Sequence, residues 1–99
     1  MGAFLYRGAA EGGAQALGRD AGRIAPGLLA DLVAIDGSHP ALCALDDTQL
    51  LDGLCFAAPD GVVTDLWSAG RHQVQGGRHL ARTAVEQRYR RAVAELVAD

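Results

Sequence analysis

The apolar positions of the first part of the chain recur at helical spacing. Residues 3–17 carry one apolar stripe at positions i, i+4, i+8 and i+11, formed by Tyr6, Ala10, Ala14 and Leu17. This pattern predicts a helix that ends at Gly18. Glycines interrupt the segment, and each internal glycine costs up to about 1 kcal/mol of helix stability relative to alanine. We therefore expect this helix to need a closely packed neighbour.

Short apolar runs between turn residues predict strands. Residues 32–35 form such a run after turn-rich residues 18–27, and Asp36-Gly37 ends it. Residues 62–69 are rich in strand-forming side chains and stop at Gly70. Residues 73–75 then read as the return arm of a hairpin, which Gly76-Gly77 closes.

Two further helices are predicted, and both carry a candidate capping box. Residues 37–45 indicate an irregular loop, after which Asp46 and Gln49 start a short helix. Thr83 and Glu86 form the second capping box, ahead of an amphipathic helix. Its apolar face consists of Val85, Tyr89, Ala92, Val93 and Leu96. We interpret the charged positions on another face, Arg88, Arg91 and Glu95, as a solvated surface.

Helices and strands alternate without an internal repeat, so the fold class is α+β. Three short strands cannot close a barrel or a sandwich, and two of them have strong β character. Their edges would stay open, which a soluble protein has to cover. The pattern therefore predicts that strands are missing, either from another chain or from an upstream segment.

Composition limits the size of the domain and the class of partner. The 99 residues are 49% apolar and 5% aromatic, which indicates one small globular domain with a thin core. Trp67 is expected to supply the largest apolar surface in that core. Nine arginines, no lysine and twelve acidic residues give a net charge of −3, which argues against nucleic acid as a partner.

The sequence predicts a cytoplasmic protein that does not act at a membrane. No apolar stretch approaches the roughly 18 residues of a membrane span, and residues 1–7 lack the features of a signal peptide. We therefore expect Cys43 and Cys55 to be reduced thiols, with a disulfide between them as the alternative.

The residues that could carry chemistry do not form a known constellation. Neither the histidines nor the thiols have the ligand spacing of a zinc site; these residues are His39, His72, His79, Cys43 and Cys55. A Cys/His nucleophile pair has no local support. Neither serine, Ser38 or Ser68, lies in a nucleophile turn.

The remaining charged candidates have structural explanations. Asp46 and Asp47 are adjacent, so they cap a helix rather than face one another as an acid/base pair. Gly18-Arg19 and Gly22-Arg23 could hold an anion, but tight turns with exposed arginines explain them better. Asp31 enters an apolar run, so we expect its carboxylate to accept backbone or arginine hydrogen bonds. We predict no catalytic, cofactor-binding or metal-binding residue in this chain.

Three segments resemble the metal-dependent amidohydrolase superfamily. Residues 12–18 (GGAQALG) lead into residues 24–36 (IAPGLLADLVAID), which is similar to the helix and strand at the end of the barrel in that superfamily. Residues 63–71 (VTDLWSAGR) followed by Gly76-Gly77-Arg78-His79 resemble the C-terminal part of the formimidoylglutamate deiminases. The resemblance extends from about Leu5 to Leu96.

This resemblance implies a hydrolase that acts on the C–N bond of a linear amidine. Such deiminases convert N-formimidoyl-L-glutamate and water to N-formyl-L-glutamate and ammonia in histidine degradation. The family implies a divalent metal, zinc, that activates water, with a carboxylate and a histidine moving protons. The family's metal ligands, a His-x-His pair, two histidines and an aspartate, match no position here. The isolated chain is therefore expected to be inactive.

The resemblance also implies a division of the chain. Residues 1–18 would be the terminal helix of a (β/α)8 barrel. Residues 19–80 would be a partial composite β-sandwich of about three to four strands with an inserted helix near 46–55, and residues 81–99 the C-terminal amphipathic helix. The partners expected are the missing barrel and the N-terminal sandwich strands, with a homo-oligomer as a further option.

Two other interpretations stay open at this point. The chain could be a non-catalytic assembly module that pairs with a separate barrel subunit. It could also derive from another amidohydrolase, such as a guanine deaminase or an imidazolonepropionase.

Overall fold

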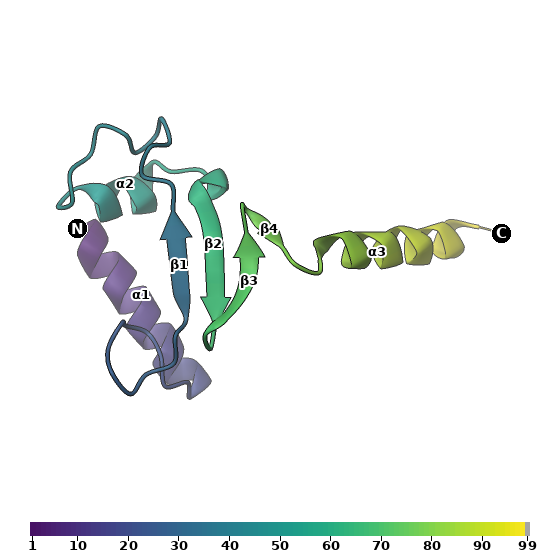
Figure 1. The fold of residues 1–99 in the computed structure, drawn as a ribbon, viewed down its shortest axis with the longest axis horizontal. Helices are drawn as coiled ribbons and strands as arrows, with labels where there is room; N and C mark the ends of the chain where they lie inside the picture. Colours follow the sequence, from purple (N-terminus) through teal and green to yellow (C-terminus); the bar gives the residue numbers. More distant parts are fainter. Residues whose placement is uncertain (99) are drawn as a thin grey trace.

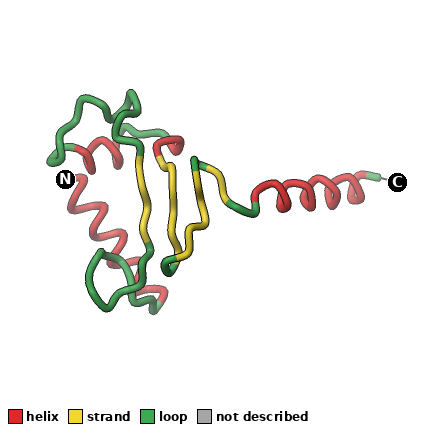
Figure 2. Tube along the Cα trace, viewed as in Figure 1, coloured by secondary structure: helices red, strands yellow, loops and turns green. Residues whose placement is uncertain are grey.

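The computed structural model describes residues 1–98, which fold into an antiparallel sheet flanked by helices (Figure 1). The elements in chain order are α1 (Gly2–Leu17), β1 (Leu32–Ile35), α2 (Leu50–Phe56), η1 (Asp60–Val62), β2 (Val63–Ser68), β3 (Arg71–Gln75), β4 (Arg78–His79) and α3 (Arg82–Val97). Figure 2 shows that long loops connect α1, β1 and α2, whereas β2, β3 and β4 follow one another through short turns. The α+β class is confirmed.

Helix α1 ends where the sequence predicts. Gly18 has left-handed backbone angles, φ 66° and ψ 32°, and its N–H donates to the carbonyl of Gln15. At the other end, Gly2 is buried against α2 and its N–H donates to Asp52 Oδ1 at 2.6 Å. An added Cβ at Gly2 would lie 2.5 Å from the backbone of α2, so the glycine permits this close approach.

The four strands pair in the order β1-β2-β3-β4, all antiparallel. Leu32 lies opposite Trp67, and Trp67 lies opposite His72. The β2–β3 turn places both Ala69 (φ 50°) and Gly70 (φ 80°) in the left-handed region, which suits the twist of a tight hairpin. The strands predicted at 32–35, 62–69 and 73–75 are thus confirmed, with slightly different ends. The strand β4 was not predicted, because its two residues are too few to show the alternation of apolar and polar positions typical of a strand.

The reciprocal hydrogen bonds of the capping box predicted before the short helix are present, but Asp46 is not the N-cap of α2, which is Gln49. Asp46 Oδ1 accepts from the Gln49 N–H at 3.1 Å, and Gln49 Oε1 accepts from the Asp46 N–H at 3.3 Å. These two residues form a turn just ahead of α2, which itself begins at Leu50.

The capping box predicted for the last helix is wrong. Helix α3 begins at Arg82, its N-cap is Ala81, and no side chain caps it. Thr83 therefore lies inside the first turn, where its hydroxyl cannot occupy the N-cap position. Glu86 instead accepts a hydrogen bond from Arg82 Nε at 2.9 Å.

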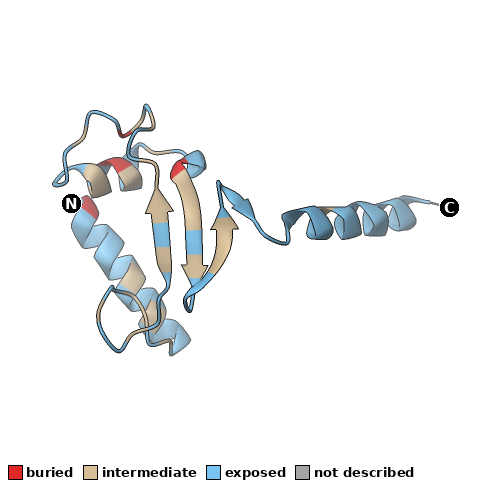
Figure 3. Ribbon diagram, viewed as in Figure 1, coloured by how far each residue is buried: buried red, intermediate tan, exposed pale blue. Residues whose placement is uncertain are grey.

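The core is smaller than expected and lies at one end of the sheet. Leu42 and Val62 are each 1% exposed and form the buried apolar core, near α2 (Figure 3). The expectation that Trp67 supplies the largest core surface is wrong. Trp67 is half-buried, and its ring stacks on His72 with centroids 4.4 Å apart.

Helix α3 projects away from the rest of the molecule (Figure 1). None of its residues is buried. The radius of gyration is 17.1 Å, whereas about 12.6 Å is typical for a compact domain of this length. We call residues 1–77 the head and residues 78–97 the arm.

Two surfaces of the head lack a neighbour among the described residues 1–98. Strand β1 pairs on one side with β2, and its other edge is unpaired within this range. An added Cβ at Gly8, Gly12 or Gly13 would meet no atom within 4 Å. The close-packed neighbour expected for these glycines is therefore not part of residues 1–98.

Within the same range, the helices are too short or too polar to cross a lipid bilayer.

Candidate functional site

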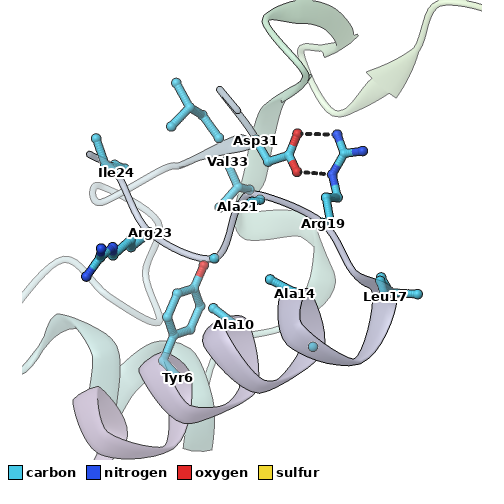
Figure 4. Close-up of a pocket in the computed structure, with 13 residues that line it drawn as sticks. Tyr6, Ala10, Ala14, Leu17, Arg19, Ala21, Arg23, Ile24, Asp31 and Val33 are labelled. Atoms are coloured by element: carbon cyan, nitrogen blue, oxygen red, sulfur yellow. Dashed lines mark hydrogen bonds and ion pairs between the residues drawn. The ribbon is translucent and has the colours of Figure 1, made fainter. Parts of the chain in front are cut away.

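The carboxylate of Asp31, just before β1, connects three segments of the head. Its two oxygens accept from Arg19 Nη2 at 2.7 Å and from Arg19 Nε at 2.5 Å (Figure 4). Oδ1 also accepts from the Ala69 N–H at 2.8 Å. This clamp joins the loop after α1, the start of β1 and the β2–β3 turn. The predicted arginine and backbone hydrogen bonds of Asp31 are confirmed.

The charge of the clamp is fixed over the ordinary pH range. Hydrogen bonds from Arg19 and from the Ala69 N–H lower the pKa of Asp31 to about 2, and Arg19 adds a favourable charge interaction. The same pairing raises the pKa of Arg19. A carboxylate this acidic and already paired is a poor general base near neutral pH. The clamp therefore holds chain segments together.

Beside the clamp lies a hollow of about 380 Å³ between α1, the following loop and β1 (Figure 4). It is lined mainly by apolar and small side chains, among them the stripe predicted on α1: Tyr6, Ala10, Ala14 and Leu17. Asp31 is the one carboxylate among its lining residues, and the clamp occupies that group. The hollow can accept an apolar group, but its lining offers no free acid/base pair.

A second polar cluster lies on one face of the β2–β3 hairpin. His72 Nε2 is 2.7 Å from Asp65 Oδ2, and His72 Nδ1 is 3.0 Å from Gln75 Nε2. Because the Gln75 side-chain nitrogen can only donate, Nδ1 accepts and Nε2–H donates to Asp65. Hydrogen bonds from the Thr64 hydroxyl and from His72 lower the pKa of Asp65 below its ordinary value.

This Asp65–His72 pair was missed by the sequence analysis. Asp65 and Trp67 are two residues apart on β2 and share a face, and the Ala69-Gly70 turn sets His72 opposite Trp67. The positions of Asp65, Trp67 and His72 about the Ala69-Gly70 turn could therefore have indicated this pair.

The other histidines and the thiols make local contacts. His39 Nδ1 accepts from the Ala41 N–H at 3.0 Å, and His79 Nδ1 accepts from the Ala81 N–H at 2.9 Å. Cys43 and Cys55 are both free and exposed. No disulfide joins these two cysteines in the structure.

The donor set of this chain does not fit the zinc that the family resemblance implies. Among residues 1–98, no three His, Cys, Asp or Glu side chains come together in a way that could hold a metal ion. Both ring nitrogens of His72 are already hydrogen-bonded, and His39 and His79 each have one nitrogen engaged.

The remaining candidates are also structural. The Ser38 hydroxyl bonds the carboxylate of Asp36 at 2.5 Å, and Asp46 caps a turn as described above. Of the arginines in the loop after α1, Arg19 serves the clamp and Arg23 lines the hollow.

Comparison with known proteins establishes the family. The sequence profile of the amidohydrolase family matches residues 4–72. The chain belongs to the amidohydrolase family. This match includes the clamp, the hollow and most of the sheet.

Two amidohydrolase relatives show how much of such a protein the chain represents. It is 40% identical over all 99 residues to the formimidoylglutamate deiminase of Pseudomonas aeruginosa and covers 21% of that protein. It is also similar to the crystal structure of an amidohydrolase from Brucella melitensis, with 38% identity and a TM-score of 0.65. That match covers 88% of this chain and 19% of the Brucella chain. The chain thus spans about a fifth of the length of these amidohydrolases.

Proposed function

We propose that this chain is the C-terminal structural segment of an amidohydrolase of the formimidoylglutamate deiminase type. The intact enzyme would hydrolyse the C–N bond of a linear amidine, converting N-formimidoyl-L-glutamate and water to N-formyl-L-glutamate and ammonia. The reaction belongs to histidine degradation and would take place in the cytoplasm. The observation that carries the proposal is the 40% identity to the Pseudomonas deiminase over all 99 residues.

The division of the chain follows from the same proposal. Residues 1–18 would be the last helix of the barrel and residues 19–80 part of the composite sandwich. Residues 81–99 would be the C-terminal helix, of which Asp99 lies outside the described residues. The open space beside Gly8 and Gly12 supports a barrel neighbour for α1, because glycines let another backbone approach closely. The unpaired edge of β1 supports the addition of sandwich strands.

The role of this chain's own residues is to hold the sandwich together. The Arg19–Asp31 clamp ties the loop after the proposed last barrel helix to the first strand and the hairpin. The zinc of the family would be held by residues of the intact enzyme outside this chain, because the donors of residues 1–98 do not fit it.

A segment exchange tests the proposal. The matching fifth of the Pseudomonas deiminase is replaced by these 99 residues, and release of ammonia from N-formimidoyl-L-glutamate is measured. We expect the chimera to keep deiminase activity, and the 99-residue chain alone, with added zinc, to release none. The matched control is a chimera with Gly8→Leu, which should fold poorly because the side chain would enter the barrel contact.

Two results would contradict the proposal. One is turnover by the isolated chain. The other is a soluble chimera that has lost activity, or one in which Gly8→Leu has no effect on folding.

The unpaired edge of β1 also favours a second candidate function. In this alternative the chain is a non-catalytic assembly module that pairs with a separate barrel subunit. It predicts that the chain, added in trans, restores activity to a Pseudomonas deiminase from which the matching segment has been deleted. A guanine or imidazolonepropionate substrate preference of the intact protein would instead indicate another amidohydrolase.

A further inference from the structure

The two ends of α1 are held by different parts of the head. At its C-terminal end lie the loop that follows Gly18 and the Arg19–Asp31 clamp, whereas α2 lies beside its N-terminal end (Figure 1). Gly2, the first residue of α1, is separated from Asp52 of α2 by 50 positions in the sequence. The N-terminal end of α1 is therefore held by a contact between distant segments.

Helix α2 holds both backbone groups of Gly2. The Gly2 N–H donates to Asp52 Oδ1 at 2.6 Å, and the Cys55 thiol donates to the Gly2 carbonyl, with Sγ 3.6 Å from the oxygen. Gly2 is buried, and a Cβ at this position would lie 2.5 Å from the backbone nitrogen of Asp52. The contact between the two helices thus leaves room for a hydrogen atom at Gly2 but not for a methyl group.

Asp52 supplies the cap that the local sequence of α1 lacks. The first N–H groups of a helix have no acceptor within the helix, and side-chain oxygens usually provide one. Met1 is the N-cap of α1, and its thioether is a weak acceptor. The carboxylate of Asp52 accepts from Gly2 instead, and it places a negative charge at the positive end of the helix dipole.

Helix α2 is in turn anchored in the core of the head. Gly53, next to Asp52, is buried. A Cβ at Gly53 would collide with the side chains of Leu45 and Leu42, and Leu42 belongs to the buried apolar core. Close packing therefore fixes the position of Asp52, so that α2 is a rigid support for the N-terminal end of α1.

The direction of α1 gives this support a place in the intact enzyme. In a (β/α)8 barrel each helix follows a strand, and the loops that lead from strand to helix form the face that carries the active site. With residues 1–18 as the last barrel helix, the N-terminal end of α1 lies at that face and its C-terminal end at the opposite one. Helix α2 then supports the chain directly after the last strand-to-helix loop.

We propose that Asp52 is a positioning residue of the intact amidohydrolase, because by capping α1 it holds the strand-to-helix loop that precedes Gly2 at the active-site face of the barrel. This inference rests on the proposed function, which places α1 in the barrel. Asp52 acts through the backbone of Gly2 and not through the substrate. Groups on a loop contribute to catalysis only while they are held in position, so a looser anchor slows the reaction.

Hydrogen–deuterium exchange in the chimera with the Pseudomonas deiminase tests the support directly. We expect Asp52→Ala to speed exchange in the loop before Gly2 and in the first turn of α1 by about fivefold, the scale of a lost helix cap. Asp52→Asn keeps an acceptor at the same position and should restore most of the protection. The matched control is Asp47→Ala, at an exposed aspartate in the turn ahead of α2, which should change nothing. Equal exchange in Asp52→Ala and Asp47→Ala would overturn the proposal.

Deiminase kinetics of the same chimeras distinguish positioning from simple stabilisation. Measured per folded molecule with N-formimidoyl-L-glutamate, kcat should fall by about tenfold in Asp52→Ala and by less in Asp52→Asn, while KM changes by less than about twofold. Gly2→Ala should lower kcat as Asp52→Ala does, because its methyl group would push α2 away. If these variants lose thermal stability but keep kcat, Asp52 is only structural and the proposal is wrong. A folded, unmodified chimera without deiminase activity would instead contradict the proposed function on which the inference rests.

Discussion

At the residue scale, the clamp at Asp31 shows why a charged residue stands at the start of an apolar strand. Its carboxylate satisfies the Arg19 guanidinium and the Ala69 N–H together. Ala69 has a positive φ, which is unfavourable for a residue with a side chain, and the bond from Asp31 helps to hold it there. One side chain thus determines the path of three segments.

The clamp predicts a specific acid sensitivity. The pKa of Asp31 is about 2 in the folded chain, below the value of 3.8 for a free aspartate. Its contribution to stability is therefore complete above about pH 4 and is lost as the pH falls towards 2. In denaturant unfolding, the chain should be more stable than Asp31→Asn at pH 6, and this difference should shrink as the pH falls below about 4 and vanish only below about pH 2. A difference that stays constant across this range would contradict the assignment.

The small core predicts that one apolar truncation unfolds the chain. Leu42 is 1% exposed, so Leu42→Ala should cost about 2–5 kcal/mol of unfolding free energy. This is comparable with the whole stability of a small domain, about 5 kcal/mol at the lower end. Leu17→Ala, at a site that is 80% exposed, is the matched control and should change stability by less than about 1 kcal/mol. Chemical denaturation followed by circular dichroism measures both.

At the scale of the elements, the sequence predicts those whose signals are local. The helix ending at Gly18 and the reciprocal hydrogen bonds between Asp46 and Gln49 depend on residues three or four positions apart, and both are present. The turns that end β2 and β3 contain Gly70 and Gly76-Gly77, whose positive φ values the structure shows.

The features that the sequence did not predict depend on contacts between elements. Thr83 and Glu86 have the spacing of a capping box, but the bonds of Leu80 and Ala81 to β3 and β4 start the helix at Arg82. Trp67 has the composition of a core residue, yet the core lies where the 37–45 loop brings Leu42 against α2. The Asp65–His72 contact requires the hairpin register.

Two glycines inside helices should respond in opposite ways to the same substitution. A Cβ at Gly53 in α2 would collide with Leu45 and Leu42, so Gly53→Ala should destabilise the chain by about 1–3 kcal/mol. A Cβ at Gly8 in α1 meets nothing within 4 Å, so Gly8→Ala should stabilise it by about 0.5–1 kcal/mol. The unfolding free energies of the two variants, measured against the unmodified chain, give the sign of each change. Equal signs would mean that the packing of α2 differs from that described.

At the scale of the whole molecule, the chain has the surface of a part rather than of a complete domain. Its radius of gyration and exposed area both exceed those of a compact chain of the same length. The excess comes from the arm, the unpaired β1 edge and the open side of α1. This agrees with a chain that spans about a fifth of its relatives.

The separation of arm and head predicts that the head folds without α3. Deleting residues 82–99 should change the unfolding free energy of the head by less than about 0.5 kcal/mol at concentrations where the chain is monomeric, because no residue of α3 is buried. Thermal unfolding at low micromolar concentration measures this. A large loss of stability would show that α3 packs on its own head.

The uncovered α3 also affects how the protein withstands digestion. Trypsin cuts after lysine or arginine in segments that open locally, and this chain has no lysine. Four of its nine arginines lie on α3, which projects into solvent, whereas Arg19 is locked in its ion pair. A brief treatment should therefore shorten the chain from its C-terminal side and leave a resistant remnant, at a rate that reports how much of α3 is shielded at any moment.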